Sequence, residues 1–96
     1  MARDDQTYVV QIDLSPADPG RLQDLLVVIR TRWPNSAILF GVVRLYAESG
    51  GANPIAAALA ANGDAVAMAE EADIPIGGDV RARIVEGSTS RPLFER

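Results

Sequence analysis

Two β-rich runs separated by a segment with helical spacing constrain this fold more than any other feature. The first run, TYVVQIDL at 7–14, is rich in β-branched and aromatic residues and stops at a Ser-Pro pair, which predicts a strand. The second run, SAILFGVVRLYAE at 36–48, is apolar on both faces as far as Arg44, which predicts one central strand between two layers. Gly41 within it indicates a bulge or a close backbone approach.

The segment between these runs has an apolar pattern that predicts a helix from about 18 to 32, closed by Pro34. At 100° per residue one narrow sector forms the stripe expected to pack on the sheet: Leu22, Leu25, Leu26, Ile29 and Trp33. Val27 and Val28 project onto the opposite side, beside Thr31. A second layer or the C-terminal tail would cover these valines in a monomer, whereas a subunit or partner would cover them in a complex.

The second half of the chain predicts one helix, an ambiguous segment and a strand. Asn53 as N-cap and Pro54 in the first turn predict a helix over 54–62, which Asn62-Gly63 can stop. For 64–72 the alanine content indicates helix, but the alternation of apolar and small residues after Asn-Gly favours a strand. VRARIVE at 80–86 predicts a strand with two faces, Val80, Ala82 and Ile84 on one and Arg81 and Arg83 on the other.

These elements predict an α/β (α+β) fold with a small mixed sheet in the order β-α-β-α-β(-β). Short joints between the first strand, helix and second strand predict a right-handed crossover between parallel strands. We expect a single domain over 1–96, in which 1–6 and 88–96 are flexible tails. The core is expected to include Leu25, Leu26, Ile29, Ile38, Phe40 and Val42.

The run TYVVQIDLSPADPGRLQDLL at 7–26 resembles the opening strand and helix of small ferredoxin-like α+β proteins. These include the antibiotic-biosynthesis-type monooxygenases, which pair as dimeric barrels. The resemblance implies a ferredoxin-like arrangement and assigns no functional residue. The hairpin that this family places between its second and third strands is not expected here, because 36–48 contains no turn signal.

Composition restricts the chemistry of the chain. Without Cys it has no disulfide or thiolate metal site, which fits a reducing cytoplasm, and without His it lacks the commonest general base and metal ligand. All nine basic residues are Arg, and the net charge of −4 argues against general binding of nucleic acid or anionic membranes. No apolar stretch has the length of a signal peptide or a membrane span. We therefore expect no metal and no cofactor.

Two groups of residues are candidates for anion binding. In ESGGANP at 48–54, four residues resemble part of a phosphate cradle: Ser49, Gly50, Gly51 and Asn53. Their spacing matches neither G-x-x-x-x-G-K-[ST] nor G-x-G-x-x-G, so a structural joint with an N-cap is the favoured interpretation. Arg81 and Arg83, joined by Arg44 from a neighbouring strand, could fork onto phosphate or carboxylate, although a solvated face with cross-strand acidic pairs is favoured.

The leading functional hypothesis is a non-enzymatic binding, assembly or inhibitory module that acts through protein–protein contacts and self-association. Its expected interface combines the outer side of the first helix with the tail: Val27, Val28, Thr31, Leu93 and Phe94. The alternative is a small homodimeric α+β enzyme or small-molecule-binding protein with a pocket between sheet and helices. A third hypothesis is an anion or nucleotide sensor at 49–53.

Overall fold

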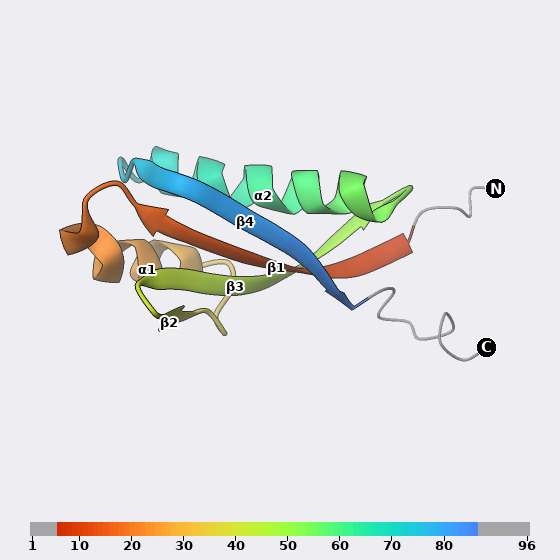
Figure 1. The fold of residues 1–96 in the computed structure, drawn as a ribbon, viewed down its shortest axis with the longest axis horizontal. Coiled ribbons are helices and arrows are strands. Elements are labelled where there is room, and N and C mark those ends of the chain that lie inside the picture. Colours follow the sequence, from red (N-terminus) through yellow and green to blue (C-terminus); the bar gives the residue numbers. More distant parts are fainter. Residues whose placement is uncertain (1–5, 87–96) are drawn as a thin grey trace.

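The computed structural model describes residues 6–86, which form a four-stranded sheet with helices on one side (Figure 1). The elements in chain order are β1 (Gln6–Pro16), the 3-10 helix η1 (Pro19–Arg21), α1 (Leu22–Arg30), β2 (Ala37–Leu39), β3 (Val42–Gly51), α2 (Pro54–Glu71) and β4 (Ile76–Glu86). The strand order across the sheet is β2-β3-β1-β4. This sequence of elements matches the βαββαβ pattern of ferredoxin-like proteins.

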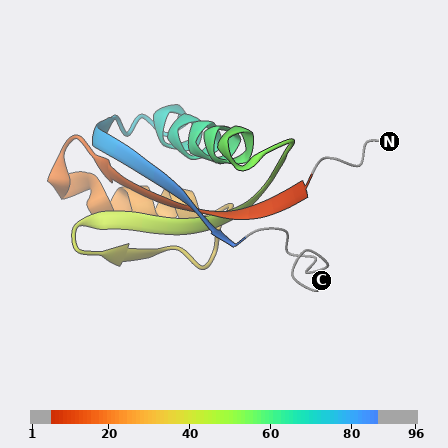
Figure 2. The same cartoon turned by 45° about the vertical axis from the view of Figure 1, so that its right-hand side comes forward.

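The sheet confirms the predicted α+β class, but it is antiparallel rather than mixed. All three neighbouring pairs, β1 with β3, β1 with β4 and β2 with β3, are antiparallel. Because β3 lies between β1 and β2, those two strands run in the same direction without touching. The predicted crossover through α1 therefore joins parallel strands that are not neighbours, and Figure 2 shows the helices on the same side of the sheet.

The prediction of one strand over 36–48 was wrong, because the segment folds back as a hairpin. Leu39 of β2 pairs with Val42 of β3, which leaves a two-residue turn at Phe40 and Gly41 with φ angles of 52° and 82°. Two positive φ angles are typical of a type I′ turn, which usually carries Asn-Gly. Gly41 is thus a turn residue rather than a bulge. Because Phe40 stands where Asn is usual, the sequence does not show a typical turn. The Phe40 side chain is fully exposed rather than in the core.

Helix α2 is twice as long as predicted, so the strand expected over 64–72 is also wrong. Its buried stripe consists of alanines at every fourth position: Ala57, Ala61, Ala65 and Ala69. Alanine contributes little to an apolar periodicity, yet its small side chain lets the helix backbone approach the sheet closely. The helix ends at Glu71. Asp73, two residues later, has a φ of 65°, and the following Ile74 N–H donates to the Ala69 carbonyl. Asn62-Gly63 therefore lies inside the helix.

The core confirms the predicted stripe of the first helix. Leu25, Leu26 and Ile29 are buried, while Leu22 and Trp33 pack against the same cluster. The sheet side of this cluster comes from alternate residues of the two central strands: Val10, Ile12 and Leu14 of β1, and Val43, Leu45 and Ala47 of β3. Ile38 is partly buried against the cluster, but Val42 lies on the other face of β3. The predicted helix over 18–32 begins as η1, where the Asp18 carboxylate accepts from Gly20 N–H.

Candidate functional site

The face of the sheet opposite the helices carries two rows of side chains that cross its three longest strands. On β1, Gln11 and Asp13 point away from the core because they alternate with the buried residues of that strand. The strand registers place Arg44, Asp13 and Arg81 in one row, and Tyr46, Gln11 and Arg83 in the next. The antiparallel pairing thus brings Arg44 to the same face as Arg81 and Arg83. Arg44 was expected on a strand next to theirs, but β1 lies between β3 and β4 and places Asp13 between Arg44 and Arg81.

Asp13 and Arg44 form a two-pronged ion pair between β1 and β3. Arg44 Nε donates to Asp13 Oδ1 at 2.8 Å, and Arg44 Nη2 donates to Oδ2 at 2.9 Å. The hydrogen bonds to Asp13 raise the pKa of the Arg44 guanidinium above its ordinary value, so the arginine stays charged. The two parallel hydrogen bonds hold both side chains in a fixed relative orientation on this face of the sheet.

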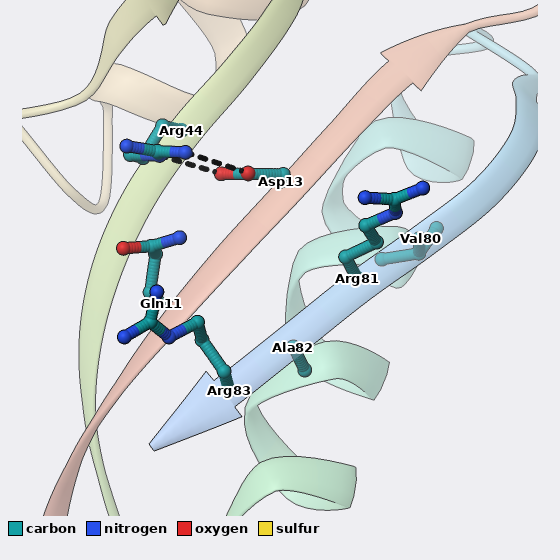
Figure 3. A pocket seen from close by; sticks show the side chains of 7 residues that line it. All are labelled: Gln11, Asp13, Arg44, Val80, Arg81, Ala82 and Arg83. Atoms are coloured by element: carbon teal, nitrogen blue, oxygen red, sulfur yellow. Dashed lines mark hydrogen bonds and ion pairs between the residues drawn. The ribbon is translucent and has the colours of Figure 1, made fainter. Parts of the chain in front are cut away.

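A groove of about 590 Å³ lies on this face between β1 and β4. Its lining residues are Gln11, Asp13, Arg44, Val80, Arg81, Ala82 and Arg83 (Figure 3). Figure 3 shows Arg83 extending from β4 across β1 toward Gln11, while the dashed pair of Asp13 and Arg44 stands beside it. Of the three arginines that line the groove, Arg44 forms an ion pair, and no ion pair of Arg81 or Arg83 occurs among the described side chains. The groove can therefore offer guanidinium donors to a negatively charged group.

The ESGGANP residues lie apart from the groove and have structural hydrogen bonds. Asn53 caps α2, since its Oδ1 accepts from Ala56 N–H at 2.8 Å. Ser49 Oγ donates to the Ala57 carbonyl at 2.9 Å, which ties the end of β3 to the helix on the covered face of the sheet. Gly50 and Gly51 are the last residues of β3. The structure thus does not combine Ser49 or Asn53 with Arg81 and Arg83 in one site.

We predict that Gly51→Ala destabilises the fold without affecting anion binding. A Cβ at this position would lie 3.0 Å from Ala57 N, 3.3 Å from Ala56 Cβ and 3.3 Å from Asn53 O. Such crowding against a helix start is expected to lower the free energy of unfolding by about 1 kcal/mol. Urea denaturation checks this value, and phosphate titration of both proteins is the control. A phosphate affinity that disappears in the variant would contradict the structural assignment.

The interface predicted on the outer side of α1 is only partly exposed. Val27 is 64% exposed, but Val28 packs against the core cluster. Thr31 Oγ1 donates to the Val28 carbonyl at 2.7 Å, which satisfies its hydroxyl at the helix end. Leu93 and Phe94 lie outside the described residues. The expected outward direction is therefore wrong for Val28, which is partly buried against the core cluster.

The exposed residue that the sequence interpretation missed is Phe40. It was placed in the core because it sits in the middle of an apolar run, whereas the turn puts it at the tip of the hairpin. Leu39 beside it and Tyr46 farther along β3 are also exposed on the hairpin. The one local signal for this arrangement is the glycine that follows Phe40.

The acidic group near the end of α2 shows no arrangement suited to a metal. Glu70 and Glu71 belong to the last turn of α2, and Asp73 occupies the left-handed position after it. Among the side chains that the structure describes, no three acidic groups come together as a metal-binding group. Within residues 6–86, no helix is both long enough and apolar enough to cross a bilayer.

No protein-family model matches this chain, and neither a curated protein nor a solved structure matches it. The resemblance of residues 7–26 to ferredoxin-like proteins therefore remains one of element order. Any functional proposal must rest on the residues themselves.

Proposed function

We propose that this protein is a non-enzymatic binding module that acts through protein–protein contacts, including self-association. We further propose that the contact is made by the hairpin surface, defined as Leu39, Phe40, Val42 and Tyr46. These four residues follow the tip and the uncovered side of the β2–β3 hairpin.

The observation that carries this proposal is the conformation and exposure of Phe40. A bulky residue in the left-handed region is disfavoured by about 1–2 kcal/mol, and Asn or Gly would fit the turn better. In addition, the aromatic ring is fully exposed to solvent. A residue that strains the turn and leaves its apolar ring unburied is best explained by a contact that buries the ring, because strained positions concentrate at functional sites.

The neighbours of Phe40 suit an interface better than an isolated surface position. Tyr46 and Phe40 are aromatic, and aromatic side chains are enriched among the residues that dominate binding energy. Leu39 and Val42 are directly opposite each other in the hairpin and add apolar area beside the ring. Burying Phe40 alone would contribute roughly 1.5–3 kcal/mol before the cost of association, so the remaining residues are needed for a stable complex.

The alternative hypothesis placed a small-molecule pocket between the sheet and the helices. In the described residues this layer contains the packed core, whose largest members, such as Ile12, Leu25 and Leu45, are fully buried. The groove of Arg81 and Arg83 lies on the opposite face. The groove and the hairpin surface are different sets of residues that meet at β3, where Tyr46 pairs with Gln11.

We predict that Phe40→Asn makes the protein more stable and less associated. Asn-Gly is the favoured pair for this turn, so the free energy of unfolding should rise by about 1 kcal/mol. The same change removes the aromatic contact and should shift the molar mass toward that of a monomer. Light scattering over a range of protein concentrations measures association, and thermal unfolding of dilute samples measures stability.

The matched control is Leu59→Gln, which removes another exposed apolar side chain, 65% exposed against 102% for Phe40, from α2. It should leave the association constant unchanged. A wild-type protein that stays monomeric at the highest concentrations would remove self-association from the proposal. If both variants lose association equally, the association depends on exposed apolar surface in general and not on the hairpin surface.

A further inference from the structure

We propose that the groove between β1 and β4 binds a small organic oxyanion, either a carboxylate or a phosphate ester, through Arg81, Arg83 and Gln11. This inference does not depend on the proposed protein-binding function. It concerns the β4 side of the uncovered face, whereas the hairpin surface extends from the β2 edge to β3, where its Tyr46 pairs with Gln11 of the groove.

Charge is the first argument for an oxyanion. The groove contains three arginines and one aspartate, which gives 3 − 1 = +2, although the whole chain has a net charge of −4. Asp13 would repel an anion, but the bidentate pair with Arg44 neutralises it at 2.8 and 2.9 Å. The two arginines of β4 are therefore the source of a local positive field on an acidic protein, and such a field attracts negatively charged ligands.

The strand geometry is the second argument. Arg81 and Arg83 are two residues apart on one face of β4, so their Cα atoms are about 6.6 Å apart and both line the groove. Figure 3 shows their exposed guanidinium groups directed apart, so a shared ligand would bind by drawing the two side chains together. A guanidinium group presents a planar fork of N–H donors that matches the oxygens of carboxylate and phosphate. Gln11 is nine-tenths buried, pairs with Arg83 in the strand register and lines the groove with its amide side chain. Three groups with fixed backbone positions thus face one cavity.

The size of the groove favours a small molecule over a nucleic acid. Its volume of about 590 Å³ lies within the range of ligand pockets, roughly 300–1,000 Å³. A nucleic acid would instead require a positive stripe along the surface, and the net charge of −4 opposes that. The ligand that fits is a compact anion with at least two oxygens, which can accept hydrogen bonds from the guanidinium groups of Arg81 and Arg83.

The test is isothermal titration of the full chain at low ionic strength with two probes, succinate and inorganic phosphate. We expect saturable binding of at least one probe, and the stronger one identifies the ligand as carboxylate or phosphate in chemistry. Arg81→Gln and Arg83→Gln should each weaken binding about tenfold, since each removes hydrogen bonds to a charged group. Arg83→Lys should weaken it less, because the charge remains while the fork is lost.

The matched control is Arg32→Gln, which removes the same charge from an exposed position near α2 that pairs with Asp64. It should leave both affinities unchanged. Nuclear magnetic resonance of the wild-type protein gives a second measurement that needs no variant: the Gln11 side-chain amide should shift on titration. Failure of both probes to saturate, an unmoved Gln11 amide, or equal weakening by Arg32→Gln would each overturn the proposal.

The Phe40→Asn variant separates this inference from the proposed function. If it retains the affinity for the anion while its association decreases, the two surfaces act independently as proposed. If it loses the anion as well, the groove is completed only in the assembly, and the assignment of the site to β1 and β4 of one chain is overturned.

Discussion

Replacing Leu25 by alanine should lower the free energy of unfolding by about 2–5 kcal/mol, the largest effect expected of any single substitution considered for this protein. Leu25 is completely buried between α1 and the sheet. Helix α1 has only nine residues, of which Leu25, Leu26 and Ile29 are buried. Loss of the middle anchor leaves a cavity that so short a helix cannot close without moving. A domain of 96 residues has a total stability of roughly 5–14 kcal/mol, so the substitution removes a large share of it.

The measurement is urea denaturation followed by far-ultraviolet circular dichroism, with the midpoint and slope fitted together. Val27→Ala is the matched control, because it removes side-chain carbons from the same helix at a position that is 64% exposed. It should change the stability by less than about 0.5 kcal/mol. Similar effects of the two substitutions would mean that α1 presents a different face to the sheet.

Adding one methyl group at Gly77 should destabilise the protein by about 1–3 kcal/mol, a second large effect that arises from overpacking. A Cβ there would lie 2.6 Å from Ala17 Cα and 3.1 Å from Ala17 N. Both are backbone atoms, and Ala17 N–H is held by a 2.8 Å hydrogen bond to the Pro75 carbonyl. Relief of the overlap would therefore have to separate the end of β1 from the start of β4.

Gly63→Ala is the control, and the same chemical change should have the opposite sign there. Gly63 lies inside α2 with nothing within 4 Å of its added Cβ, so alanine gains helix propensity without a clash. We expect stabilisation by about 0.5–1 kcal/mol. Thermal unfolding of both variants gives the comparison. A Gly77→Ala protein as stable as the wild type would show that β1 and β4 approach each other less closely at this end.

The elements predicted correctly are those in which the pattern of apolar and polar residues within one segment shows which side chains are buried. TYVVQIDL became β1 because its alternation separates a buried face from a polar one. The stripe around Leu25 and Ile29 placed α1 correctly, since large apolar residues at helical spacing have one way to be buried. The N-cap at Asn53 was also correct, because a cap needs only the few residues that follow it. In the candidate site, the alternation of Arg81 and Arg83 on β4 was visible for the same local reason.

The errors occurred where the local signal was weak or absent. The turn at Phe40 and Gly41 lacks the usual Asn-Gly pair, so a hairpin was read as one strand. The buried stripe of α2 consists of alanines, whose small apolar area cannot compete with the more conspicuous alternation around Val66. In both cases contacts with the sheet outweigh local preference, since most of the stability of a short element comes from tertiary packing.

Local sequence thus determines where β1, α1 and the start of α2 form, because burial of alternate or fourth residues leaves a pattern within a single segment. The register between strands leaves no such pattern. Only the folded sheet places Arg44 and Arg81 on either side of Asp13, at sequence separations of 31 and 68 residues. The exposure of Phe40 depends in the same way on the return of the chain through β3. Both candidate surfaces combine residues from different strands, and the pairing of those strands is a cooperative property of the whole fold.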